Sequence, residues 1–239
     1  MTLDSFSFTS KGGREENQDT VLIKNQENGG LFLVADGLGG YQRGKEASEC
    51  VSNAISSAWD SKLTINADWM TGQIDQANRR LLEECKEKRC TMKSTVVALS
   101  VIGKDAVWAH TGDSRLYGIR KNKVTQLTND HSVAFMKYKT GTITKAQIAK
   151  DEDQSALLRA IGTEERWKPE TGNSTVAPGD AFMLCSDGMW EYITDDEILI
   201  DYLKSETAEE WGVQMLRRIM ERITPGNDNL TVLTLMIGE

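Results

Sequence analysis

The chain of 239 residues is 39% hydrophobic and 27% charged, a composition that predicts a folded protein and excludes global disorder. Its formal net charge of −8 disfavours nucleic acid and anionic membranes as main partners, because both attract basic proteins. The sequence contains neither an apolar run of roughly 20 residues, which would span a bilayer, nor a secretion signal. Four scattered cysteines fit a reducing compartment. We therefore expect a cytoplasmic monomer with one domain, residues 1–239.

The N-terminal part of the chain predicts three strands and then two helices. Phe6 and Phe8 alternate with polar residues, and Leu31–Ala35 is a continuous apolar run typical of a buried strand. The predicted elements are strands around Phe6 and Phe8, over Thr20–Ile23 and over Leu31–Ala35, and helices from Gly44 to about Trp59 and from Asp68 to about Glu87. Asp68 is the expected N-cap of the second helix, because aspartate accepts hydrogen bonds from a first helical turn.

The remainder alternates between strands, a polar insertion and acidic helices. Further strands are predicted over Ser94–Ile102, Ala106–His110, Ser114–Arg120, Lys123–Leu127, Asp180–Cys185 and Leu230–Ile237. Helices are predicted over Asp195–Leu203 and Thr207–Ile223. Residues 129–169 are polar, with short helical pieces expected at Val133–Lys139, Thr144–Ala149 and Ser155–Ile161, a pattern typical of an insertion or lid.

Five aspartates stand at strand ends. Asp36, Asp113 and Asp187 each follow an apolar strand, whereas Asp19 and Asp228 each precede one. Carboxylates gathered on one rim of a sheet repel one another unless cations lie among them. Oxygen ligands without histidine or cysteine select Mg²⁺ or Mn²⁺, and two such ions about 3.5–4 Å apart can activate water and clamp a phosphoryl group. The alternative is that each aspartate belongs to an ordinary surface turn.

Two other patterns leave alternatives open. Gly39–Lys45 has the spacing of a nucleotide-binding P-loop, but Glu46 stands where a serine or threonine must ligate Mg²⁺. His131, between Asp130 and Ser132, could donate a proton to a leaving group or hold its turn by hydrogen bonds.

Six segments together carry a resemblance that spans essentially the whole chain. They are Arg14–Asp19, Ala35–Gly40, Gly112–Arg115, Asp130–Ser132, Ser186–Gly188 and Asp228–Asn229. In this order they resemble the metal-dependent serine/threonine protein phosphatases of the type 2C class, and the compact length resembles the bacterial branch. The resemblance implies an α+β fold, a four-layer α-β-β-α sandwich of two antiparallel sheets flanked by helices. Residues 129–169 would form the flap beside the active site.

The resemblance also implies a set of metal ligands for two Mn²⁺ or Mg²⁺ ions and a weaker third. Asp36 would bridge two ions and the Gly37 carbonyl would bind one of them. Asp187 and Asp228 would complete the shell of the first ion, and Asp19 would act on the other through water. Asp113 would centre the third site, which it would share with Asp187.

Arg14 would hold the substrate phosphate, a role that suits a guanidinium fork. The implied reaction is hydrolysis of phosphoserine and phosphothreonine in proteins, substrates of a serine/threonine kinase, by direct attack of a hydroxide that bridges two metals. Glu191 and Leu38 depart from the common pattern of aspartate and histidine, so the general acid stays unassigned. The alternative is a catalytically weak regulator that binds phosphoproteins on the same fold.

Overall fold

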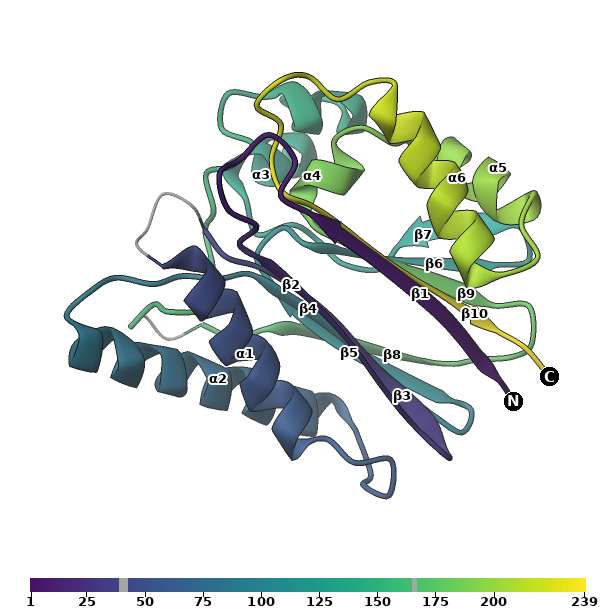
Figure 1. The fold of residues 1–239 in the computed structure, drawn as a ribbon, viewed down its shortest axis with the longest axis horizontal. Coiled ribbons are helices and arrows are strands. Elements are labelled where there is room, and N and C mark those ends of the chain that lie inside the picture. The colour runs from purple at the N-terminus through teal and green to yellow at the C-terminus, as the bar shows by residue number, and fades with distance from the viewer. Residues whose placement is uncertain (39–42, 165–166) are drawn as a thin grey trace.

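Two five-stranded antiparallel sheets face each other at the centre of the protein (Figure 1). A computed structural model describes residues 1–38, 43–164 and 167–239. In spatial order, the first sheet contains β1 (Leu3–Ser10), β10 (Leu230–Ile237), β9 (Ala181–Cys185), β6 (Arg115–Arg120) and β7 (Lys123–Gln126). The second sheet contains β2 (Asp19–Gln26), β3 (Gly29–Asp36), β4 (Val96–Ile102), β5 (Asp105–Thr111) and β8 (Glu170–Thr175).

Helices cover the outer face of each sheet (Figure 1). α1 (Gly44–Ala58) and α2 (Ala67–Lys88) pack on the second sheet. α4 (Asp187–Trp190), α5 (Asp195–Leu203) and α6 (Ala208–Met220) pack on the first sheet, and α3 (Val133–Lys139) and the 3₁₀ helix η1 (Lys145–Lys150) belong to the insertion. The expected α+β sandwich with layers α-β-β-α is confirmed.

The apolar run of β3 explains why three hydrophobic layers form. Successive side chains of a strand point to opposite faces, so a strand buried on both faces needs hydrophobic residues at every position. Leu31 and Leu33 pack toward α1 and α2, whereas Phe32 and Val34 pack between the two sheets. All four side chains are fully buried. The strand therefore ends in a rigid setting, and its last residue is Asp36.

α6 shows how the same principle places a helix. Trp211, Met215 and Ile219 recur every four residues and are fully buried in the layer between this helix and the first sheet. The helix begins after Thr207, whose side chain accepts a hydrogen bond from the Glu210 amide at 3.1 Å. The prediction of a helix in this region is confirmed, although it ends at Met220 rather than Ile223.

Three local predictions differ from the structure. Asn66, not Asp68, is the N-cap of α2, because its Oδ1 accepts from the Trp69 amide at 2.8 Å. The predicted helical piece Ser155–Ile161 is wrong: Leu157 and Ile161 form β-bridges with Ser132 and Ser94. β8 was not predicted, because this edge strand is polar and half exposed and so lacks an apolar pattern.

Positions 39–42 of the P-loop-like stretch lie outside the described residues, whereas Glu46 is described and pairs with Arg43 and Lys88. Within the described ranges, no helix is long and apolar enough to cross a membrane.

Candidate active site

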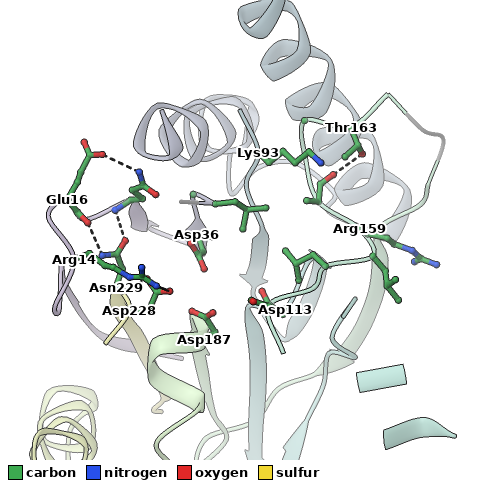
Figure 2. A pocket seen from close by; sticks show the side chains of 18 of the residues that line it. Arg14, Glu16, Asp36, Lys93, Asp113, Arg159, Thr163, Asp187, Asp228 and Asn229 are labelled. Carbon is green, nitrogen blue, oxygen red and sulfur yellow. Dashed lines mark hydrogen bonds and ion pairs between the residues drawn. The ribbon is translucent and has the colours of Figure 1, made fainter. Parts of the chain in front are cut away.

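The strand ends of both sheets meet at a cavity of about 1300 Å³ (Figure 2). Figure 2 shows Asp36, Asp113 and Asp187 directed into the cavity from different elements. The predicted site residues that line it are Arg14, Asp36, Gly37, Asp113, Asp187 and Asp228. Side chains separated by as much as 214 positions in the sequence therefore share one site. The insertion contributes lining residues between Ser155 and Glu164.

Asp19 lies directly opposite Asp36 in the pairing of β2 with β3. Like charges at directly opposed positions of an antiparallel pair repel each other. Asp19 is only 1% exposed. Burial is the largest cause that raises the pKa of Asp36 well above its usual range, and the charges of Asp19 and Asp187 raise it further. A pair of this kind ionises fully only when positive charge is supplied nearby.

The same electrostatic conflict extends across the first sheet. Burial raises the pKa of Asp187 to about 7, and Asp228 and Asp19 add to the rise. Burial followed by the charge of Asp187 raises the pKa of Asp113 well above its usual range. Glu191, at the end of α4, has its pKa raised to about 8 by burial and then by Asp187 and Asp228. The mutual effects of these groups confirm that they share one electrostatic environment.

Asp19 presents an oxygen whose hydrogen-bonding capacity is not satisfied. Its Oδ2 accepts a hydrogen bond from the Ser186 hydroxyl at 2.7 Å. Its Oδ1 is buried and has no hydrogen-bond partner among the described residues. A buried, unpartnered carboxylate oxygen is costly unless another group, such as a cation or water, occupies its surroundings. The donor set fits hard divalent cations, because it consists of carboxylate oxygens with backbone carbonyls close by.

Gly37 is required by its close approach to the backbone of α1. A Cβ atom at this position would overlap the carbonyl oxygen of Gly44 and would lie 2.8 Å from the Gln18 carbonyl oxygen. The Gly37 amide donates a hydrogen bond to the same Gln18 carbonyl at 3.2 Å. The contact that excludes a side chain therefore comes from the start of α1 and from Gln18.

Arg14 forms a bidentate ion pair with Asp228. Its Nε and Nη2 donate to the two carboxylate oxygens at 3.1 and 2.8 Å. The Arg14 side chain is 55% exposed and that of Asp228 is 40% exposed. An exposed pair of this kind stabilises a protein by only about 0–1 kcal/mol, so another anion can compete for the guanidinium at little cost.

Asn229 is a site residue to which sequence reasoning assigned no role. Its Nδ2 donates to the carbonyls of Lys11 and Glu16 at 2.9 Å each, and its Oδ1 accepts from the Gln18 amide at 2.8 Å. Asn229 is 5% exposed. It therefore holds the segment that carries Arg14 against the start of β10. The signal available in the sequence was its place immediately after Asp228.

Comparisons with known proteins agree with this arrangement. Residues 12–230 match the family described as Protein phosphatase 2C. A serine/threonine phosphatase stp from Listeria welshimeri is 31% identical over 230 residues, 92% of this chain and 90% of that protein. The crystal structure of serine/threonine phosphatase Stp1 from Staphylococcus aureus has a TM-score of 0.90 at 29% identity, covering 100% of this chain and 96% of that one.

A second similar structure contains metal. The catalytic domain of the serine/threonine protein phosphatase PstP, solved in complex with two manganese ions, has a TM-score of 0.86 at 24% identity and covers 99% of both chains. The family match extends over nearly the full length and both solved structures share the entire fold. The chain therefore belongs to the protein phosphatase 2C family.

Proposed function

We propose that this protein is a Mn²⁺- or Mg²⁺-dependent phosphatase that hydrolyses phosphoserine and phosphothreonine in proteins. The observation that carries the proposal is the convergence of Asp36, Asp113, Asp187 and Asp228 with Arg14 on one cavity. The pKa of Asp187, raised to about 7, supports the proposal. Buried carboxylates that repel one another destabilise a fold, so a group of them in a cavity indicates a functional site that binds cations. The similar proteins from Listeria welshimeri and Staphylococcus aureus are named serine/threonine phosphatases, which agrees with the proposed substrates.

The proposed ligands of two divalent ions are those that the family resemblance implies, and their convergence on one cavity supports them. Asp36 would be shared by both ions and the Gly37 carbonyl would bind one of them, Asp187 and Asp228 would complete the shell of the first ion, and Asp19 would act on the other through water. Asp113, together with Asp187, is the proposed centre of a weaker third site. When bound, the ions supply the charge that lets these acids ionise together and that lowers the pKa of a shared water for direct attack on phosphorus.

Arg14 is the proposed binding group for the substrate phosphate. Its guanidinium matches the geometry of phosphate oxygens and develops charge-assisted hydrogen bonds with them. The exposed pairing with Asp228 is weak enough to be exchanged for a phosphate dianion. Asn229 supports this role by fixing the backbone on both sides of Arg14, at Lys11 and Glu16.

Residues 129–169 are proposed to act as a flap within a single catalytic domain, residues 1–239. Leu158 and Arg159 of this segment line the cavity, and the Leu158 side chain is 55% exposed. An exposed leucine beside an arginine offers a protein substrate an apolar and a cationic contact next to the reacting phosphate. We further propose that the protein is a monomer in the cytoplasm. Its proposed partners are proteins that a serine/threonine kinase has phosphorylated.

The decisive experiment measures release of phosphate from a phosphothreonine peptide with and without Mn²⁺. We expect hydrolysis that requires the metal and that falls about a hundredfold or more in Asp187→Asn. Asp196→Asn, an exposed aspartate of α5, is the matched control and should retain wild-type activity. Tight binding of the phosphopeptide without turnover by the metal-loaded protein would instead support the alternative of a phosphoprotein-binding regulator.

A further inference from the structure

The segment Asp130–Ser132 is joined to the Gly112–Asp113 turn by a reciprocal pair of hydrogen bonds. The His131 amide donates to the Gly112 carbonyl at 2.9 Å. In return, the Gly112 amide donates to Nδ1 of the His131 ring at 3.2 Å. Both backbone polar groups of Gly112, the residue before Asp113, are thus held by His131, which is not among the residues that line the cavity.

This turn has a backbone conformation that needs such support. Gly112 has φ +101°, in the region that residues with a Cβ rarely adopt, and an added Cβ would lie 2.6 Å from Thr95 Cγ2. Gly112 is buried, so an amide without an acceptor there would destabilise the turn. The imidazole of His131 provides this acceptor.

The protonation state of His131 follows from the same contact. N–H donors face both ring nitrogens, Gly112 at 3.2 Å from Nδ1 and Arg159 at 3.4 Å from Nε2. We assign the acceptor role to Nδ1, because the Gly112 contact is shorter and its amide is buried, and the hydrogen to Nε2. Burial, followed by the neighbouring His110 and Arg159, lowers the pKa of His131 to about 3, so the ring is neutral at physiological pH. Its stacking on His110, with centroids 4.7 Å apart and planes 10° from parallel, fixes the orientation of the ring.

Asp130 supports the Asp113 carbonyl, on the other side of the same turn, through Arg115 and Trp190. Arg115 donates to the Asp130 carboxylate at 2.9 and 2.6 Å, and its guanidinium lies 3.5 Å from the centroid of the Trp190 ring. The Trp190 indole N–H donates to the Asp113 carbonyl at 3.0 Å. Consecutive residues of one segment therefore hold the backbone on both sides of the Asp113 side chain.

The same segment also connects the turn to the cavity-lining part of the flap. The Leu158 amide donates to the His131 carbonyl at 2.7 Å, and the Val133 amide donates to the Ala156 carbonyl at 2.9 Å. Leu158 lines the cavity. His131 therefore hydrogen-bonds both to Gly112 and to Leu158, which lies beside the cavity.

We propose that His131 is a positioning residue that sets the Gly112–Asp113 backbone, and with it the Asp113 carboxylate, and couples that carboxylate to the flap. Its catalytic consequence rests on the proposed phosphatase function. His131 neither contacts substrate nor supplies a proton. It acts by accepting a hydrogen bond from the Gly112 amide.

A competing interpretation is a transition-metal site. His110, His131 and Glu170 offer ligand atoms within 4.8 Å of one another. His131 would have to ligate through Nε2, but that nitrogen carries the hydrogen while Nδ1 accepts from Gly112. In addition, the cationic Arg159 Nη1 lies 3.4 Å from the same Nε2. Both features oppose a cation there and favour the positioning role.

The test compares two amide substitutions that differ only in where they place an acceptor. His131→Asn puts Oδ1 near the position of Nδ1, whereas His131→Gln puts its amide one bond further out. We expect His131→Gln to lower kcat about tenfold or more with KM within about threefold of wild type, and His131→Asn to retain kcat within about threefold. Hydrogen exchange at the Gly112 amide should accelerate about tenfold in His131→Gln only.

The control is Glu170→Gln, which preserves the size of a residue that faces both histidines. It should leave kcat and Gly112 exchange unchanged. Wild-type kcat and Gly112 protection in His131→Gln would overturn the proposal. Loss of kcat in His131→Asn with Gly112 still protected would overturn it too, since the imidazole would then act chemically. Zn²⁺ binding that is lost in Glu170→Gln would establish the metal site instead.

Failure of the phosphatase function itself would be recognised separately. In that case the wild-type protein would not hydrolyse the phosphopeptide with Mn²⁺. The exchange of the Gly112 amide and the ¹³C shift of the Asp113 carboxylate need no turnover. Both should still change in His131→Gln and remain near wild type in His131→Asn, and unchanged values in both variants would overturn the positioning role.

Discussion

Asp36 combines two properties that oppose each other in a metal-free protein. It ends a strand whose hydrophobic residues are buried on both faces, so its backbone is rigid. Its carboxylate faces Asp19 across the β2–β3 pair and feels Asp187 across the cavity. Rigid backbones prevent the acids from moving apart, so without a cation the repulsion between them is relieved by bound protons, as their raised pKa values indicate.

Asp36→Asn should separate stability from activity. The neutral amide removes one charge from the repelling group, so we expect the metal-free variant to be more stable than wild type by about 0.5–1 kcal/mol at pH 8. Activity with Mn²⁺ should fall about a hundredfold or more. Urea unfolding in EDTA and phosphopeptide hydrolysis measure the two effects. Asp105→Asn, an exposed aspartate at the start of β5, should change neither.

Asn229→Ala should affect both stability and substrate binding. Three hydrogen bonds to the backbone of the segment around Arg14 are lost, and we expect the free energy of unfolding to fall by about 2–4 kcal/mol. KM should rise more than kcat falls, because Arg14 would lose its fixed position. Asn173→Ala, on the exposed edge of β8, is the control. An unchanged KM in the folded variant would contradict the assigned role.

At the scale of secondary-structure elements, a buried ion pair joins β6 to the entrance of the insertion. The Arg115 side chain is 6% exposed and the Asp130 side chain is fully buried. Arg115 also donates to the Tyr117 hydroxyl at 3.0 Å and packs on Trp190 at the end of α4. Three elements therefore depend on one guanidinium, and its partner Asp130 stands at the start of the insertion.

Asp130→Ala should be strongly destabilising. It leaves Arg115 buried without its counter-charge, and the expected loss is about 3–5 kcal/mol in the free energy of unfolding, measured by urea titration. Asp153→Ala provides the comparison. Asp153 pairs with Lys137 in the same insertion, but its side chain is 43% exposed, so water replaces the lost interaction and no measurable change is expected. Equal effects of the two substitutions would contradict this account.

At the scale of the whole molecule, the sandwich brings two sheets to one site. Asp19 and Asp36 come from the second sheet, whereas Asp187 and Asp228 flank strands of the first. Neither sheet holds the set alone. Packing of Phe32 and Val34 between the sheets therefore helps to set the separation of the acids.

The pH dependence of this assembly has a defined sign. Without metal, Asp187 keeps its proton up to a pKa of about 7, whereas an aspartate in the unfolded chain loses it near pH 4. The folded protein binds more protons than the unfolded chain between about pH 4 and 7. This contribution to stability is fully present below about pH 4 and is lost as the pH rises to about 7.

Mn²⁺ binding should consequently release protons at pH 6 and fewer at pH 9. The acids must be ionised to act as ligands, so the affinity for Mn²⁺ should rise with pH. Calorimetric titrations in two buffers with different ionisation enthalpies give the number of protons released. Identical binding heats in both buffers at pH 6 would contradict the prediction.

The sequence alone determined the elements whose patterning is strong. The apolar run Leu31–Ala35 and the four-residue spacing of Trp211, Met215 and Ile219 predicted a strand and a helix, because burial requires those periods. Combined motifs identified the family and named four aspartates that line the cavity, Asp36, Asp113, Asp187 and Asp228. Polar segments gave no comparable signal, and for that reason β8 was missed and Ser155–Ile161 was predicted as a helix.

Only the tertiary structure decided how distant residues act on one another. The opposition of Asp19 to Asp36 depends on strand register, and the clamp of Asn229 on the Arg14 segment joins the two ends of the chain. The pairing of His131 with Gly112 likewise depends on where the insertion folds back. Hydrophobic periodicity is local and can be seen in sequence. Hydrogen bonds and charge coupling depend on distances that arise only when the layers pack.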